Sequence, residues 1–141
     1  MNGFLVDTNC ISEVVRPKPE PRVVDWMEAA DESTLYLSVL TIGEIRKGFA
    51  GLPRGKHRTR LERWIEVELP GRFWGRVLPI DEAIAQRWGA IAENAKRKGR
   101  PLAVIDGLLA ATALQHNLTI VSRNIRDFAS AQVPILNPWM R

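Results

Sequence analysis

The chain has little cysteine and no long apolar run. Cys10 is its single cysteine, so neither an intrachain disulfide nor a site built from several thiolates can form. No apolar stretch approaches the roughly 20 residues that span a bilayer, and the first residues lack the basic start and longer apolar stretch of a signal peptide. We therefore expect a soluble protein of the reducing cytoplasm, without a membrane association.

Histidine is also scarce, and His57 and His116 have no metal-ligand spacing, so we do not expect a zinc site. The composition, 45% hydrophobic and 26% charged, is that of a globular protein. A formal charge of +4 and a pI of about 9.7 suit a polyanionic partner such as nucleic acid. The length suits one compact domain that spans residues 1–141.

Apolar runs alternate with helical patterns along the chain. We expect strands at 4–6, 34–38, 76–80, 118–122 and 133–136, and helices at 8–15, 20–30, 41–51, 54–69, 81–98 and 102–116. No hairpin signal joins two strands, which predicts an α/β fold with a parallel sheet of four or five strands, covered by helices on both faces. Pro70-Gly71 is expected to end the helix before it, and Pro101 to lie near the first turn of the next one.

Three acidic side chains are expected at the edge of the sheet where the parallel strands end. Asp7 directly follows the first strand, and Glu44 lies one turn into the helix after the second. Each has a simpler interpretation, Asp7 as a helix N-cap and Glu44 as the acid of a T-x-x-E capping box that begins at Thr41. Asp106 is more telling, because positions three, four and seven residues later form an apolar stripe where an unpaired carboxylate is costly. A first-turn acid would, however, also suit the helix dipole.

The stretch VSRNIRDF (121–128) adds Ser122, Arg123, Asn124 and Asp127 to the same edge. Oxygen ligands from several strand ends, without clustered His or Cys, are typical of a hard cation such as Mg²⁺ or Mn²⁺. Without a cation, the converging carboxylates would repel one another and raise each other's pKa. The residues therefore predict a divalent-cation site at this edge.

Two basic tracts accompany these acids in the sequence, one within 46–63 and the other at 96–100. Each leads out of or into a helix that carries an acid, so both are suited to hold phosphates, although a solvated helix face has the same pattern. Trp64, Phe73 and Trp74 could stack on unpaired bases. Such aromatics are more often core or subunit contacts, and we assign them no catalytic role.

The tracts LVDTN, LTIGEIRKG and AVIDGLLAATALQHNLTIVSRNIRDF, in this order, resemble the PIN-domain ribonucleases, and more narrowly the VapC-type toxins of bacterial toxin–antitoxin pairs. GRVLPIDE and the ending NPW are most similar to the FitB-like branch. The resemblance covers nearly the whole chain and implies a PIN-like three-layer α/β/α sandwich. It also implies a cytoplasmic endoribonuclease that uses Mg²⁺ or Mn²⁺ to activate water and cleaves tRNA or another structured RNA.

Position by position, the resemblance implies that Asp7, Glu44 and Asp106 are catalytic metal ligands. The fourth acid of the family falls on Asn124, which could ligate through its carbonyl oxygen or orient a metal-bound water, with Asp127 one turn later to assist. The residues expected to contact the substrate are Arg46, Lys47, Ser122 and Arg123. The family also implies a homodimer and a cognate antitoxin, a segment of which binds a groove formed by the early helices.

Two other interpretations of these residues compete with this one. Aspartate-nucleophile phosphatases also have an Asp at the tip of the first strand, but their chemistry needs a second Asp where Asn9 stands. A catalytically weakened PIN-like domain that binds RNA or a partner protein would fit Asn124. Three costly acids at one edge have little use in a pure binding module, which favours the enzyme.

Overall fold

The computed structural model of the protein describes residues 3–140 and is built around a five-stranded parallel sheet in the order β3-β2-β1-β4-β5. The strands are β1 Phe4–Val6, β2 Leu35–Ser38, β3 Val77–Leu78, β4 Thr119–Val121 and β5 Ile135–Leu136. In β1, Phe4 lies opposite Leu35 of β2 on one side and Thr119 of β4 on the other. The first strand is therefore central, and the carboxyl ends of all strands share one edge.

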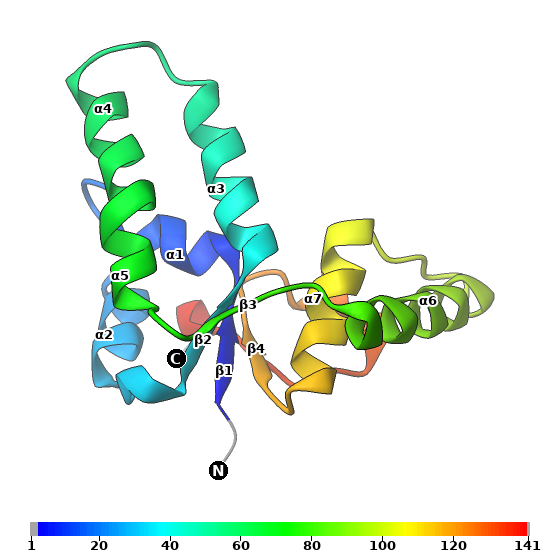
Figure 1. Cartoon of the computed structure of the whole chain (residues 1–141). Helices are drawn as coiled ribbons and strands as arrows, with labels where there is room; N and C mark the ends of the chain where they lie inside the picture. Colours follow the sequence, from blue (N-terminus) through cyan, green and yellow to red (C-terminus); the bar gives the residue numbers. More distant parts are fainter. Residues whose placement is uncertain (1–2, 141) are drawn as a thin grey trace.

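Helices cover both faces of the sheet (Figure 1). They are α1 Thr8–Val14, α2 Pro21–Ala29, α3 Val39–Ala50, α4 Lys56–Arg63, α5 Leu69–Arg72, α6 Glu82–Arg97, α7 Val104–Gln115 and α8 Ile125–Phe128, with a π-helical segment at Trp64–Glu68 and 3-10 turns at Glu32–Thr34, Ala129–Ala131 and Pro138–Met140. The arrangement confirms the expected three-layer α/β/α fold. No helix between residues 3 and 140 is long and apolar enough to cross a membrane.

The short strands alternate their side chains between two separate cores. Leu5 packs with Leu109 of α7, whereas the next residue, Val6, packs with Ile11 of α1 and Phe73. This alternation is the two-residue period of a strand, and both neighbours are apolar because both faces of a parallel sheet are covered. The sheet therefore gives β1 a rigid position between two packed layers.

The helix that starts at Lys56 continues past Pro70, so the expectation that Pro70-Gly71 ends it is wrong. The chain passes through the π-helical segment, where the Leu69 N–H donates to the Trp64 carbonyl, and resumes as α5. Pro70 lies in the first turn of α5, where a missing N–H costs little. Wider π turns of this kind interrupt helices without ending them.

The three aromatics near this break lie in different surroundings. Phe73 is fully buried in the core, and Trp64 packs at a tilt against Phe49 with ring centroids 6.1 Å apart. Trp74, by contrast, is 85% exposed. Core packing thus accounts for Phe73, and for much of Trp64.

The helix α7 begins at Val104, two residues later than the sequence predicts. Pro101 therefore lies before the N-cap residue Ala103 and outside the first turn. No side chain caps this start, so its position is set by packing rather than by a local signal. Gly107 allows the close approach to α6, because a Cβ there would lie 2.8 Å from Cδ1 of Trp88. This glycine thereby fixes the turn of α7 that carries Asp106.

We expect Gly107→Ala to lower the free energy of unfolding by about 2 kcal/mol, because the added methyl must displace the Trp88 ring. Gly89→Ala is the matched control, since it places a methyl on α6 with nothing within 4 Å and improves the helix propensity. Urea denaturation measures both variants. Equal effects at the two positions would show that the contact with Trp88 is unimportant.

Candidate active site

Asp7 lies at the carboxyl end of β1, where the sequence predicts it, and is only 7% exposed. Its backbone N–H donates to the Val121 carbonyl of β4 at 2.9 Å, which fixes the residue against the sheet. Its Oδ1 accepts from the Thr8 N–H at 2.7 Å, so Asp7 is also the N-cap of α1. Its Oδ2 accepts from the Ser122 hydroxyl at 2.7 Å. The capping interpretation therefore holds, and it leaves the carboxylate anchored at the sheet edge.

Glu44 lies at the same edge of the sheet, but a contact from a residue distant in the sequence positions it there. The helix α3 begins at Val39, because the Ser38 hydroxyl caps it by accepting from the Leu40 N–H at 3.0 Å. Thr41 lies inside the helix, so the capping-box interpretation is wrong. Instead, Oε1 of Glu44 accepts a hydrogen bond from the Thr8 hydroxyl at 2.6 Å. Glu44 and Asp7 are thus linked through one residue, Thr8.

Ser122 is the centre of the hydrogen bonds behind Asp7 rather than an exposed group. It is fully buried, and its Oγ donates to Asp7 while it accepts from Asn9 Nδ2 at 3.2 Å and from the Asn124 N–H at 3.0 Å. Asn9 in turn accepts from the Arg123 N–H at 3.4 Å. These bonds tie the loop after β4 to the start of α1, and Asn124 enters the network through its backbone.

Replacing Ser122 with alanine should leave three polar groups without their buried partner and cost about 2 kcal/mol of stability. The Ser122 bond also lowers the pKa of Asp7, so its loss should raise that pKa further and weaken the carboxylate as a ligand. Thermal denaturation and divalent-cation titration test the two effects. A variant as stable as the wild type, with unchanged cation affinity, would contradict this role.

Asp106 and Asp127 complete the acidic cluster, which we define as Asp7, Glu44, Asp106 and Asp127. Burial raises the pKa of Asp106 to about 6, and the negative charges of Asp127, Asp7 and Glu44 contribute to the increase. Burial also raises the pKa of Asp7, with Glu44 and Asp127 adding to it. The four carboxylates therefore act on one another electrostatically. Sequence reasoning gave Asp127 only an assisting role, although VSRNIRDF places it one turn after Asn124.

The basic residues predicted to contact substrate lie in different surroundings. The Arg46 guanidinium is paired with Glu66 at 2.9 Å, and that of Arg123 lies 5.2 Å from the centre of the Trp139 ring. Lys47 lines a pocket together with Glu44. A different hollow, of about 500 Å³, brings two further arginines beside the cluster; its lining is Arg100, Pro101, Ala103, Asp106, Arg126, Asp127, Ala129 and Ser130. Arg126 was not predicted, since a lone arginine in a short helix has no distinguishing pattern.

The donor set of the acidic cluster fits a hard divalent cation. Its members are oxygen ligands, and within residues 3–140 none of them forms an ion pair with Lys or Arg. Carboxylates that repel one another and lack a cationic partner are what Mg²⁺ or Mn²⁺ would stabilise. In the same described range, no three Asp, Glu, His or Cys side chains are grouped closely enough to hold a metal. Mutual repulsion favours such separation, so rotation of the side chains would have to accompany binding.

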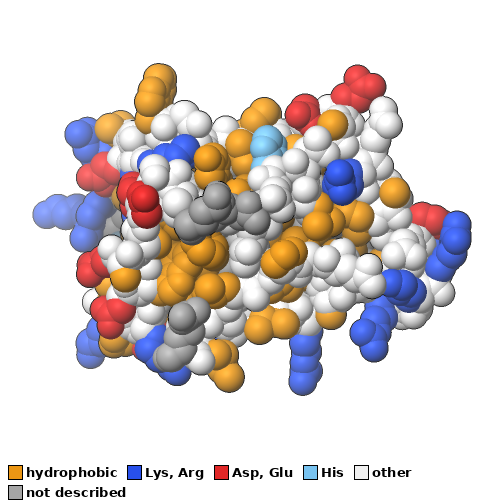
Figure 2. Space-filling model, turned by 90° about the horizontal axis from the view of Figure 1, so that it is seen from below, with side chains coloured by type: hydrophobic (Ala, Val, Ile, Leu, Met, Phe, Trp, Pro, Cys, Tyr) orange, Lys and Arg blue, Asp and Glu red, His pale blue; other side chains and the backbone are white. Residues whose placement is uncertain are grey.

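Figure 2 shows the end of the molecule where the strands begin, opposite the edge that carries the acidic cluster. Hydrophobic side chains occupy much of its middle, and Asp and Glu side chains lie toward its outline. The acidic cluster belongs instead to the edge where the strands finish, beside the starts of α1, α3 and α7 (Figure 1). Concentrated negative charge and a hollow between helices therefore coincide at the carboxyl edge.

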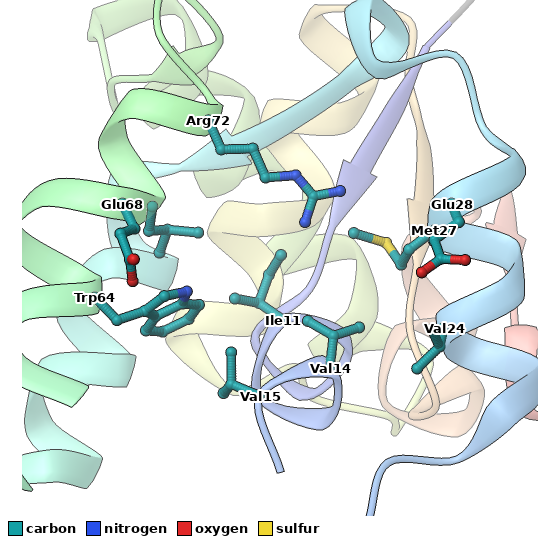
Figure 3. A pocket seen from close by; sticks show the side chains of 10 residues that line it. Ile11, Val14, Val15, Val24, Met27, Glu28, Trp64, Glu68 and Arg72 are labelled. Carbon is teal, nitrogen blue, oxygen red and sulfur yellow. The ribbon is translucent and has the colours of Figure 1, made fainter. Parts of the chain in front are cut away.

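A separate hollow, which we call the α1–α2 groove, contains no member of the acidic cluster (Figure 3). Its volume is about 400 Å³, and its lining is Ile11, Val14, Val15, Val24, Met27, Glu28, Trp64, Glu68, Leu69 and Arg72. Aliphatic side chains of α1 face the indole of Trp64 across it, and the carboxylates of Glu28 and Glu68 lie on opposite sides. Arg72 is engaged by Glu32 through bonds of 2.7 and 3.2 Å. The groove is thus apolar inside with acids on two sides.

Comparison with known proteins shows the family of the chain. The model of the PIN domain family matches residues 4–133, so the chain belongs to the PIN domain family, as the motifs predict. Individual proteins of known name are also similar to the chain. The chain is 42% identical over 136 residues to the toxin FitB of Neisseria gonorrhoeae, covering 96% of this chain and 98% of that protein. It is 37% identical over 136 residues to the VapC ribonuclease Y4jK of Sinorhizobium fredii, with coverages of 96% and 97%.

Among solved structures, the chain resembles one in the crystal structure of FitAcB from Neisseria gonorrhoeae. The TM-score is 0.93 at 41% sequence identity, and the match covers 98% of this chain and 99% of the other. The agreement extends over the sheet and the helices on both faces. It confirms the expected fold and the resemblance to the FitB-like branch.

Proposed function

We propose that the chain is a divalent-cation-dependent endoribonuclease and the toxin of a toxin–antitoxin pair. The observation that carries the proposal is that Asp7, Glu44 and Asp106 come from three separate segments, act on one another electrostatically and have no cationic partner in the described part of the chain. The names of the two relatives, a toxin and a VapC ribonuclease, support the same function. The proposed location is the cytoplasm, where RNA is available.

In this proposal Asp7, Glu44 and Asp106 hold Mg²⁺ or Mn²⁺, which when bound would supply an acidified water and relieve charge on the phosphate. The chain orients these ligands: the sheet and Ser122 fix Asp7, and Thr8 holds Glu44. These bonds limit how far the Asp7 and Glu44 side chains must reorient when a cation binds.

The substrate would be held by the basic side chains that line the hollows next to the acids. Lys47 lies on the side of Glu44, and Arg100 and Arg126 lie on the side of Asp106. Phosphates on both sides of the cleaved bond would then meet positive charge, which fixes the register of the RNA without reading its sequence. The side chain of Asn124 is exposed and makes no capping bond, so it is a candidate to orient the attacking water.

The test is incubation of the purified chain, free of any partner, with total cellular RNA in Mg²⁺ or Mn²⁺. Discrete products that disappear with a chelator, and in Glu44→Gln, are expected. Glutamine keeps an acceptor for the Thr8 hydroxyl and removes only the charge. If a folded, cation-binding sample releases no products, a partner-binding domain becomes the better interpretation. Products that persist in Glu44→Gln would place the active site elsewhere.

We further propose that the α1–α2 groove receives a segment of the cognate antitoxin, as the resemblance to VapC-type toxins implies. The apolar interior suits aliphatic or aromatic side chains of a peptide, and Glu28 and Glu68 suit basic residues next to them. The groove is formed by α1, α2 and the helical segment that leads into α5. A homodimer, and a single PIN domain over residues 1–141, belong to the same proposal.

Val24→Glu should weaken the complex with the co-expressed antitoxin by at least about 100-fold, because it buries a charge in an apolar groove. The control is Val67→Glu, which changes a valine that is 54% exposed and lies outside the groove. Calorimetric titration compares the two variants. Equal affinities would mean that the antitoxin binds another surface.

A further inference from the structure

A second apolar pocket opens directly beside the acidic cluster, between α3 and α7. Its volume is about 570 Å³, within the usual range of small-molecule sites, and its lining is Val39, Leu40, Gly43, Glu44, Lys47, Gly48 and Ile105. Glu44 belongs to the cluster, and Ile105 directly precedes Asp106. We call this hollow the α3–α7 pocket. It therefore lies against one acid of the cluster, Glu44, on helices that begin at the carboxyl edge of the sheet (Figure 1).

Apolar side chains are unusually exposed around this edge. Val39, Val104 and Ile125 are 41%, 58% and 45% exposed, and they are the first residues of α3, α7 and α8. A purely electrostatic grip on phosphates would not need apolar groups here. Exposed apolar side chains next to a charged site indicate a ligand that combines charge with an apolar face. A nucleotide has this combination, since its base is planar and largely apolar on its faces.

We propose that the α3–α7 pocket binds one unstacked base of the RNA, next to the phosphate that is cleaved. This inference rests on the proposed ribonuclease function and specifies its substrate. The base would lie against Val39, Leu40 and Ile105, with the Lys47 ammonium at the rim able to meet the adjoining phosphate. A base inside a duplex cannot enter such a pocket, so the substrate must be single-stranded or looped at the cut.

A second copy of the chain is the competing occupant, and the lining argues against it. Glu44 faces both the pocket and the Thr8 link to Asp7, so a protein that filled the pocket would cover a carboxylate needed for chemistry. Lys47 is exposed, and within residues 3–140 no carboxylate is paired with it. A polyanion satisfies this lysine and leaves the acids accessible to the reacting phosphate.

The glycines of α3 allow the pocket to be filled without disturbing the fold. A Cβ at Gly43 would meet nothing within 4 Å, so Gly43→Leu places its side chain in open space. Leucine also has a higher helix propensity than glycine. Gly89→Leu is the matched control, because Gly89 is an exposed helical glycine of α6 with nothing within 4 Å and no part in the pocket.

The experiment uses a short RNA that spans a cleavage site mapped in total RNA, and a set in which each nucleotide near the cut in turn lacks its base. For the wild type, one abasic position beside the cut should lower kcat/KM by about tenfold. With the complete RNA, the kcat/KM of Gly43→Leu should be about tenfold lower than that of the wild type. With that abasic RNA, the variant and the wild type should have the same kcat/KM, because both changes remove the same contact. Fluorescence anisotropy in an Asp106→Asn background should give the same pattern for binding alone.

Several outcomes would overturn the inference. The pocket does not hold a base if Gly43→Leu has the same kcat/KM as Gly89→Leu. The same conclusion follows if the substitution and the missing base lower kcat/KM independently, so that their factors multiply. In both cases the proposed ribonuclease function is unaffected. If Gly43→Leu instead changes the molar mass in light scattering, the pocket is covered by a second copy. If the wild type cleaves no RNA at all, the proposed function fails and this inference fails with it.

Discussion

Asp106→Asn is expected to lose RNA cleavage by about 1,000-fold and yet to be more stable than the wild type when divalent cations are absent. The loss follows because removal of one ligand charge weakens the cation that neutralises the phosphate, an effect of several kcal/mol on the barrier. The gain in stability follows because the Asp106 carboxylate is held near three other negative charges, which together with burial raise its pKa to about 6. The side chain is only partly buried, so solvent screens these charges and we expect a gain of about 1 kcal/mol.

The same pKa fixes the sign of a pH effect on the chelated wild type. A carboxyl group with a pKa of about 6 in the folded protein and 3.8 as its ordinary value binds more protons in the folded state between these pH values. The contribution of Asp106 to the free energy of unfolding should therefore rise as the pH is lowered from 7 to 5. The difference between wild type and Asp106→Asn should shrink over the same range. Urea denaturation at several pH values in chelator measures both effects.

Asp25→Asn provides the control, since Asp25 is exposed on α2, outside the acidic cluster. It should leave cleavage unchanged. Addition of Mg²⁺ should stabilise the wild type and Asp25→Asn more than Asp106→Asn. A chelated Asp106→Asn that is less stable than the wild type at pH 7 would show that Asp106 has a favourable partner and is not a strained ligand.

The sheet and three of the acids were predictable because their signals are local. A short apolar run followed by Asp7, or by a helix with Glu44 in its first turns, places a carboxylate at the sheet edge once the strands are known to be parallel. The position of Asp106 follows similarly from the apolar stripe behind it, whose buried members include Leu109 and Ala110. The expected strands lie close to the observed ones, with differences of one or two residues at their ends.

The features that the sequence did not reveal depend on groups far apart in the chain. The T-x-x-E pattern at Thr41 competes with a contact from Thr8, and the tertiary contact determines where Glu44 lies. Likewise, a proline usually ends a helix. The π-helical segment before Pro70, however, places this proline in the first turn of α5, where no N–H is required. Local propensity gives the type of element, and packing decides its boundaries and the partners of its polar side chains.

Asp127→Asn is expected to weaken the affinity for Mg²⁺ by about tenfold, and Asn124→Asp in the same chain to recover most of the loss. Asn124 occupies the position where the resemblance places a fourth acid, yet the charge that acts on both Asp7 and Asp106 comes from Asp127. Asp127 also lines the hollow that contains Asp106. Within this segment, the negative charge therefore lies three residues after Asn124, on Asp127 of α8.

The double variant separates this compensation from a weakened site. If Asp127 supplies the missing charge, Asn124→Asp alone should strengthen Mg²⁺ binding, the single Asp127→Asn should weaken it, and the two changes together should leave it near the wild-type value. The measurement is the shift in melting temperature across a Mg²⁺ titration, with RNA cleavage followed in parallel. If Asp127→Asn binds and cleaves like the wild type, three acids suffice and the fourth charge is dispensable. A large gain in cleavage from Asn124→Asp alone would instead mean that Asn124 limits the natural activity of the chain.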